Sequence, residues 1–272
     1  MKWPKKETFW IEGNTVYVSV PFTWRLPAVK AKANQRSFFW DRAIIGGPAT
    51  CLMPDYFDGM SHVTIGKDMP GVLQRVNPLA TKTSTGCVRR CPFCAVPKNE
   101  GKLTELKDWP DLPILIDNNL LATSKKHFDR VIDRLKKFDF VDFNQGLDSR
   151  LLTEHHARRF AELKRPILRL ALDNIEYADG WVKAVSILYD AGIPKSLIQS
   201  YALFGFETDP AEAWERANFI EEHKVKVLPA WYHELDAMET GIVTDKQGAL
   251  GWTDYKRREI MQWFYWHKKA VL

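Results

Sequence analysis

Residues 79–94 of the chain read LATKTSTGCVRRCPFC. A short run suited to a β-strand, residues 79–83, leads into Cys87, Cys91 and Cys94, which have the spacing C-x3-C-x2-C. Cysteines concentrated in one tight loop are typical of a metal or cluster site in a reducing compartment, and a disulfide framework would distribute them more widely. The stretch therefore predicts a metal-binding loop directly after a strand.

The composition is that of a globular protein. The 272 residues include 45% hydrophobic and 12% aromatic residues, which is ample for a core. The 39 basic and 34 acidic residues leave a net charge of +5, which permits a polyanionic partner without requiring one. No apolar run approaches the ~20 residues of a membrane span, so we expect a cytoplasmic protein with no membrane partner. Cys51 stands alone upstream, and we expect it to be a buried apolar residue, with a redox or extra ligand role as the alternative.

Short apolar runs alternate with amphipathic stretches from residue 79 onward, a pattern typical of repeated strand–helix units and a parallel sheet. The strand candidates are residues 79–83, 113–117, 140–144, 167–172, 197–204 and 225–231. Consecutive units of this kind curl toward a barrel, with ligand groups at the carboxyl ends of the strands. The predicted fold is therefore α/β: a partial (β/α)6 TIM-like barrel with a small N-terminal α/β segment and a C-terminal helix.

The helices between these strands have readable ends. Ser124 and Thr153 each precede a stretch with helical periodicity, and Asp209-Pro210 supplies a capping residue followed by proline at the first helical position. Gly192 is a left-handed stop for the helix before it. A last amphipathic helix, residues 253–269, is rich in aromatic residues, and we expect it to pack across the exterior or the mouth of the barrel.

The first 78 residues differ from the rest, since strand-like segments such as residues 15–20 and the turn Gly46-Gly47-Pro48 dominate them. We predict two domains, an N-terminal α/β segment at 1–78 and a main domain at 79–272 that carries the C-terminal helical extension.

Three thiolates cannot complete every iron of a [4Fe-4S] cluster, so one iron keeps an open position that a small molecule can chelate. Structural zinc is the main alternative, but it normally needs a fourth protein ligand, and the sequence has no second cysteine or histidine knuckle.

The motif, with an aromatic residue just before its last cysteine, resembles the signature of the radical S-adenosylmethionine (SAM) superfamily. The resemblance covers about residues 79–232. It implies that Cys87, Cys91 and Cys94 hold a [4Fe-4S] cluster whose open iron binds SAM. Reductive cleavage would then give a 5′-deoxyadenosyl radical, with electrons from a donor such as flavodoxin or ferredoxin. Phe93 would pack near the adenine, or plug the space beneath the loop.

The resemblance also implies cofactor contacts at the strand ends. Asp117 and Asn119, which follow the second strand, are candidates for the SAM ammonium, because a carboxylate or amide oxygen accepts its hydrogen bonds. A turn that uses both side chains locally is the alternative. After the third strand, Gln145 would reach the ribose and Arg150 the SAM carboxylate, and a surface salt bridge is the alternative for Arg150.

Later strands offer further candidates. Asp173 ends the fourth strand and would face the mouth. Gly205 and Glu207 lie in a segment similar to the family's glycine-containing fifth-strand motif, where a glycine lets the adenine approach the backbone. A plain strand-to-helix turn fits these residues as well.

The N-terminal segment is faintly similar to part of a cobalamin-binding domain and could be a degenerate remnant of one. It is too short for that domain and lacks the Asp-x-His-x-x-Gly motif, so we do not expect cobalamin.

The substrate and the catalytic residues are not predicted. A nucleic acid base is one candidate, because basic and aromatic residues alternate on the last helix. The alternative to an enzyme is a non-catalytic iron–sulfur or zinc module, such as a redox sensor or nucleic-acid-binding protein.

Overall fold

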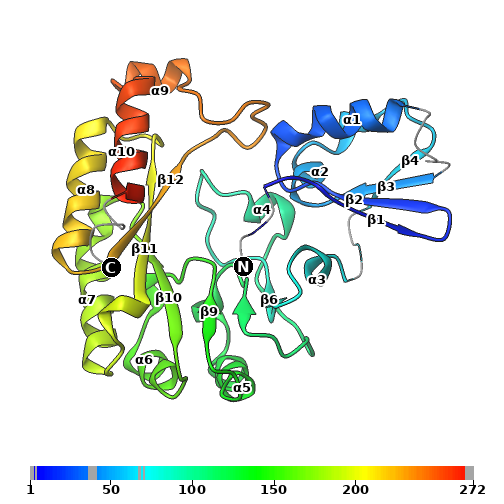
Figure 1. The fold of residues 1–272 in the computed structure, drawn as a ribbon. Coiled ribbons are helices and arrows are strands. Elements are labelled where there is room, and N and C mark those ends of the chain that lie inside the picture. The colour runs from blue at the N-terminus through cyan, green and yellow to red at the C-terminus, as the bar shows by residue number, and fades with distance from the viewer. Residues whose placement is uncertain (1–2, 4, 36–41, 67–68, 70, 267–272) are drawn as a thin grey trace. The chain divides into compact units, whose positions relative to one another are not determined.

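A computed structural model of the chain describes residues 3, 5–35, 42–66, 69 and 71–266. It divides into two compact units (Figure 1). The larger unit comprises Thr81–Arg89, Lys102–Tyr232 and Gly241–Leu272, and the smaller one comprises Met1–Ala80, Arg90–Gly101 and His233–Thr240. The smaller unit thus includes two segments from later in the chain. The expected division into domains at 1–78 and 79–272 stays a prediction.

A six-stranded sheet forms the centre of the larger unit, in the order β12-β11-β10-β9-β8-β5. Its strands are β5 (Ala80–Thr81), β8 (Ile114–Leu115), β9 (Val141–Phe143), β10 (Pro166–Ala171), β11 (Ile198–Phe204) and β12 (Lys226–Trp231). Each predicted strand is present, and the order of the strands across the sheet is their order in the chain. The pairs from β8 to β12 are parallel. The fold is therefore α/β with a parallel sheet. In the described part of the chain β5 and β12 are the two edges, so the sheet is not closed.

Helices follow the strands and cover one face of this sheet (Figure 1). They are α5 (Lys125–Leu135), α6 (Glu154–Ala161), α7 (Ala178–Asp190) and α8 (Pro210–Glu222). The predicted caps are confirmed, because Ser124, Thr153 and Asp209 accept hydrogen bonds from backbone N–H groups in the first turns of α5, α6 and α8. Gly192 has φ +83°, as a left-handed stop after α7 requires.

The two faces of the sheet differ in character. Along β10 and β11 every second residue is buried, and those residues, such as Leu168 and Phe204, pack against the helices in one continuous apolar core. The intervening residues, which include Arg169 and Tyr201, lie on the opposite face and are only partly buried. The polar side chains of the strands therefore gather on the face that the helices leave uncovered.

The C-terminal segment of the larger unit contains α9 (Asp245–Ala249) and α10 (Asp254–Trp266). Helix α10 contacts α8 and β12. Its Phe264 is buried against Trp214 of α8, with ring centroids 5.6 Å apart, and Trp263 lies 5.7 Å from the same ring. The predicted helix at 253–269 is thus confirmed as far as residue 266, packed on the exterior, and residues 267–269 lie outside the described residues.

The smaller unit has a four-stranded sheet in the order β1-β2-β3-β4. Its strands are β1 (Thr8–Glu12), β2 (Thr15–Ser19), β3 (Arg42–Gly46) and β4 (Val63–Gly66). Strands β1 and β2 are antiparallel, and the other pairs are parallel. Helices lie at α1 (Leu26–Asn34), α2 (Pro48–Leu52), α3 (Val72–Val76) and α4 (Val96–Asn99). Gly47, in the predicted turn, has φ +98°, and a Cβ there would lie 2.8 Å from backbone atoms of Val20.

Two further short strands, β6 (Ser84–Thr85) and β7 (Thr104–Glu105), pair with each other in an antiparallel manner. The segment of chain between them carries the clustered cysteines. Single turns of 3-10 helix lie at Thr23–Arg25, Pro54–Phe57, Leu120–Ala122, Ser149–Leu151, Ile175–Tyr177 and Lys195–Leu197.

Candidate cofactor site

Cys87 belongs to the larger unit and directly follows β6 and Gly86. Gly86 has φ +70°, a left-handed conformation that a glycine adopts at no steric cost. The Cys87 side chain is half-buried. Its Sγ accepts a hydrogen bond from the backbone N–H of Arg89 at 3.3 Å and another from the side-chain amide of Asn119 at 3.7 Å. Two N–H donors are thus directed at this one sulfur.

Cys91 and Cys94 belong to the smaller unit, just before α4. The N–H of Cys94 donates to the carbonyl oxygen of Cys91 at 3.0 Å, which closes a turn around Pro92 and Phe93. Both cysteines are half-buried and neither forms a disulfide. Phe93, between them, is also half-buried. Among the described residues, no group of three or more His, Cys, Asp or Glu side chains is gathered closely enough to hold a metal ion.

Asp117 follows β8 and anchors the segment that leads into the cysteine loop. Its buried carboxylate accepts hydrogen bonds from the backbone N–H and the hydroxyl of both Thr83 and Ser84, and the hydroxyl distances to Oδ1 are 2.7 and 2.6 Å. Burial raises the pKa of the Asp117 carboxyl, and these donors oppose the rise. Because its oxygens are engaged in this way, Asp117 holds the start of the loop in place.

Asn119, two residues further on, is 2% exposed. Its Nδ2 reaches Cys87, whereas its Oδ1 is buried with no hydrogen-bond partner. A buried acceptor without a donor is costly, which distinguishes this oxygen from the carboxylate oxygens of Asp117. The two residues predicted for one task therefore differ: Asp117 is satisfied by the protein, and Asn119 is not.

His127 of α5 extends this buried polar group. Its Nε2 lies 3.2 Å from the Thr83 hydroxyl, and its Nδ1 lies 3.7 Å from a carboxylate oxygen of Glu105. Burial lowers the pKa of His127, against the opposing effects of Glu105 and Asp117. The imidazole is thus held behind the loop in its neutral form at neutral pH.

Asp148, between β9 and α6, holds two arginines. Its carboxylate accepts from Nε of Arg89 at 2.8 Å and from Nε of Arg150 at 2.7 Å. Burial favours a higher pKa for Asp148, but Arg150 and Arg89 outweigh it and hold the pKa below its usual range. The Arg150 guanidinium also lies over the Tyr177 ring, 4.8 Å from its centroid. Arg150 therefore forms the salt bridge considered as its alternative role, and Gln145 is exposed nearby in the chain.

Asp173 lies two residues after β10, and one of its carboxylate oxygens accepts from the backbone N–H of Leu203 at 3.2 Å. Burial raises the pKa of Asp173, with the nearby Arg216 opposing the rise. Arg216 of α8 is fully buried and donates to the carbonyl oxygens of Leu172 at 3.1 Å and Leu203 at 2.8 Å. Arg216 thus connects the chain at the carboxyl ends of β10 and β11 through hydrogen bonds. One of the two residues that it contacts, Leu203, also donates to Asp173.

Gly205 follows β11 with φ +79°. A Cβ there would lie 2.7 Å from the Trp231 ring and 2.9 Å from the Gln247 amide. Gln247 is buried, and its amide donates to the carbonyl oxygen of Gly205 at 3.0 Å. Two side chains of the protein itself thus require a glycine at this position, and the adenine contact expected from the sequence stays a prediction. Glu207 is exposed, with φ +52°, in the turn before α8.

The uncovered face of the sheet carries a polar group that the sequence did not reveal. Arg169 of β10 forms an ion pair with Asp142 of β9, and the Tyr201 hydroxyl of β11 donates to the carbonyl oxygen of Asn144 at 2.9 Å. A Cβ at Gly146 would lie 3.6 Å from that of Ala171, which leaves ordinary van der Waals spacing. This part of the face therefore carries an ion pair and a tyrosine hydroxyl.

The structure brings some of the predicted residues together. Cys87 and Asn119 are in contact, and the Arg89–Asp148 ion pair connects the loop to the segment of Arg150. Asp173 and Gly205 lie at the neighbouring ends of β10 and β11.

The sequence interpretation missed the roles of Asp148 and Arg216. The position of Asp148, two residues before Arg150 on a strand-end segment, was an available signal. The sequence contains no signal for the buried role of Arg216, because an arginine within an amphipathic helix is normally exposed.

The basic residues of α10 make local hydrogen bonds and ion pairs. Lys256 donates to the carbonyl oxygen of Gly251 at 2.9 Å, and Arg257 lies 3.4 Å from Asp254. Arg258 donates to the backbone of Asp254 at 3.2 Å. These groups satisfy the ends and flank of the helix, and the nucleic-acid partner stays a prediction.

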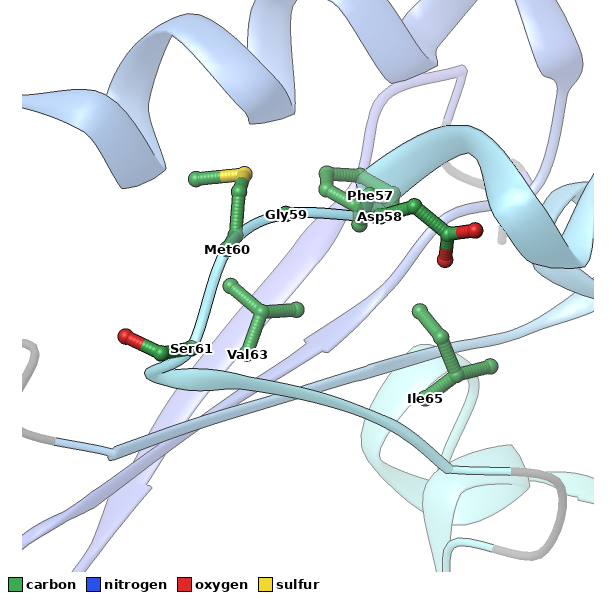
Figure 2. A pocket seen from close by; sticks show the side chains of 7 residues that line it. All are labelled: Phe57, Asp58, Gly59, Met60, Ser61, Val63 and Ile65. Carbon is green, nitrogen blue, oxygen red and sulfur yellow. The ribbon is translucent and has the colours of Figure 1, made fainter.

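The smaller unit has an open hollow beside the loop that follows Phe57 (Figure 2). Its lining residues are Phe57, Asp58, Gly59, Met60, Ser61, Val63 and Ile65. Figure 2 shows the Asp58 carboxylate on the other side of the loop from Ser61. The side chains are mainly apolar, and the predicted cofactor residues do not line it. Within the described residues, no helix is long and apolar enough to cross a membrane.

Comparisons with known proteins add little. No protein-family model matches the chain, and no curated protein matches it. Among solved structures, the crystal structure of Streptococcus suis SuiB bound to S-adenosylmethionine aligns with a TM-score of 0.43 and 13% identity, over 96% of this chain and 69% of that chain. Similarity at this level does not establish a common fold or function.

Proposed function

We propose that this chain is a radical SAM enzyme whose sheet is a partial (β/α)6 barrel. The observation that carries the proposal is the C-x3-C-x2-C loop, which follows the first strand of a six-stranded sheet whose strands are in chain order. Its three thiols are free of disulfides and supply a donor set that suits a [4Fe-4S] cluster with one open iron.

Side chains near Cys87 and in the cysteine loop offer groups that suit particular parts of SAM. Asn119 offers a buried Oδ1 without a partner, which suits an ammonium donor. We therefore assign the SAM amino group to Asn119, and we assign Asp117 to anchoring Thr83 and Ser84. Phe93, between two of the cysteines, is the candidate neighbour of the adenine.

When bound, the reduced cluster and SAM supply a 5′-deoxyadenosyl radical for hydrogen abstraction. The chain itself positions the reactants and supplies the electrostatic environment. Arg150 is held by Asp148 and can exchange this partner for the SAM carboxylate, and the exposed Gln145 is the candidate for the ribose. Asp173 lies where the neighbouring strand ends meet, and we propose that it faces the bound molecules. We do not assign a SAM contact to Gly205, because Trp231 and Gln247 lie close beside it.

A low-potential one-electron donor, such as a flavodoxin or ferredoxin, would reduce the cluster. The substrate lies over the polar face of the sheet in this proposal. The charges of Asp142 and Arg169 neutralise each other there, and this pair does not favour a nucleic acid over a smaller polar molecule.

The test is anaerobic reconstitution of the full chain with iron and sulfide, followed by metal analysis, electron paramagnetic resonance (EPR) and assay of 5′-deoxyadenosine after addition of SAM and dithionite. We expect about four irons per chain, as a [4Fe-4S] cluster requires. Cys87→Ser, Cys91→Ser and Cys94→Ser should each lose the cluster signal, whereas Cys51→Ser on α2 should retain it. One tightly bound zinc, or unchanged iron content in all three loop variants, would favour a non-catalytic metal module instead. An intact cluster that never cleaves SAM would exclude the enzyme.

A further inference from the structure

The side chain of Asn119 does not cap the helical turn that it precedes. It precedes the 3-10 turn Leu120–Ala122, and asparagine at such a position commonly caps the turn with its side chain. Here the side chain forms no capping hydrogen bond, and the backbone carbonyl accepts from the N–H of Ala122 instead. The amide is therefore directed elsewhere, and its Nδ2 lies 3.7 Å from Sγ of Cys87, within reach of a hydrogen bond to the large sulfur atom.

The surroundings keep this amide in place. Leu120 and Leu121, the next two residues, are buried in the main apolar core. On the other side, Asp117 is fixed by its hydrogen bonds to Thr83 and Ser84, which lead into the loop of Cys87. The donor and the sulfur are thus held from both sides by buried contacts.

A ligating thiolate has no proton, so only the N–H side of the amide can face it favourably. The Arg89 backbone N–H supplies a second donor to the same sulfur at 3.3 Å, and the ion pair of Arg89 with Asp148 stabilises that position. Hydrogen bonds to cluster sulfurs are a principal means by which proteins set reduction potentials. They favour the reduced cluster, which carries the additional negative charge.

We infer that Asn119 is a positioning residue that donates a hydrogen bond to the Cys87 thiolate and raises the reduction potential of the proposed cluster. The inference rests on the proposed function. One electron enters from the external donor, no bond is broken in this step, and the amide gives up no proton. The same side chain leaves Oδ1 for the SAM ammonium, so a single residue connects the ease of reduction with cofactor binding.

The experiment is a potentiometric titration of the reconstituted cluster in the full chain, followed by EPR without SAM. Asn119→Leu keeps the approximate shape and removes the donor, and Asn119→Asp replaces the donor with a negative oxygen. We expect the reduced-to-oxidised ratio at a fixed potential to fall about tenfold in Asn119→Leu, which is about 59 mV for one electron. Asn119→Asp should show at least the same fall.

The matched control is Asn174→Leu. The Asn174 side chain accepts from the backbone N–H of Glu176 at 2.8 Å, so its amide is engaged in a different turn, and the potential should remain unchanged. An unchanged or higher potential in both Asn119 variants would overturn the inference and leave the proposed enzyme intact. Failure of both variants to assemble a cluster that Asn174→Leu assembles would also overturn it, because the role would then be assembly. Failure of the unaltered protein to form any [4Fe-4S] cluster would refute the proposed function itself.

Discussion

The carboxylate of Asp117 accepts a hydrogen bond from the hydroxyl of Thr83 at 2.7 Å, deep in the larger unit. This contact joins the end of β8 to the segment that leads into the cysteine loop, four residues before Cys87. The position of the loop thus depends on a polar contact between neighbouring strands, and the packing of apolar side chains does not determine it alone.

Asp117→Asn should destabilise the larger unit by about 2 kcal/mol. The NH2 group of asparagine replaces an accepting oxygen, so that buried N–H or O–H groups of Thr83 and Ser84 lose their acceptor. Urea unfolding followed by circular dichroism measures the change. The control is Asp139→Asn, which removes only a surface partner of Lys164 and should have little effect. Equal unfolding of the two variants would mean that the Asp117 contacts contribute nothing.

The stability of the protein should depend on pH through His127. Burial holds its pKa below the ordinary 6.5 in the folded protein, so below pH 6.5 the unfolded chain takes up a proton that the folded protein resists. The contribution of the neutral imidazole is fully present above pH 6.5 and is lost as the pH falls. The difference in unfolding free energy between the unaltered protein and His127→Gln should therefore shrink between pH 7.5 and pH 5.5. The prediction fails if this difference is the same at both values.

Gly205→Ala should be destabilising for two reasons, a left-handed backbone and a Cβ that collides with Trp231 at 2.7 Å. Gly192→Ala is the matched control, since Gly192 has φ +83° but no atom within 4 Å of its Cβ position. We expect a loss of about 1 kcal/mol in the control from backbone strain and at least twice that in Gly205→Ala. Thermal unfolding of both variants separates the two causes. Equal losses would show that the ring moves aside freely.

The order of strands and the helix caps could be predicted because both depend on local signals. Apolar runs of strand length alternate with helical periodicity, and Ser124, Thr153 and Asp209 stand directly before their helices. Five of the six strands are shorter than predicted, and β10 has the predicted length. Residues 79–83 yield only Ala80–Thr81, because Thr83 and Ser84 direct their backbone N–H groups to the Asp117 side chain instead of to a strand partner.

The site was harder to predict, because its contacts join residues that are distant in the chain. The sequence places Asp117 and Asn119 at one strand end, but it does not reveal that the protein already satisfies the first and leaves an oxygen of the second unpaired. It also does not reveal that Trp231 and Gln247, which are 26 and 42 residues further along the chain, lie beside Gly205. Side chains that fill a space from another part of the chain carry no local signal.

Phe264→Ala should destabilise the larger unit by about 3 kcal/mol, because the ring is buried against Trp214 of α8 and its removal leaves a cavity. Tyr255→Ala on the same helix is the control, since that side chain is 71% exposed and should change the stability little. Urea unfolding compares them. If Tyr255→Ala proved as destabilising as Phe264→Ala, the packing of α10 on α8 would be refuted.

Arg216→Leu should cost about 3 kcal/mol, more than the loss of an ordinary surface arginine. The buried guanidinium donates to the carbonyl oxygens of Leu172 and Leu203, and its removal leaves both without that donor. Arg158→Leu on α6 is the control, because its partner Glu154 is exposed and the pair contributes little. Hydrogen exchange provides a local measurement. Because Arg216 joins the ends of β10 and β11, the backbone N–H of Leu203, which donates to Asp173, should exchange faster in Arg216→Leu and not in Arg158→Leu. A global loss of stability without this local effect would mean that Arg216 contributes only packing, and the position of Asp173 at the strand ends would then require another explanation.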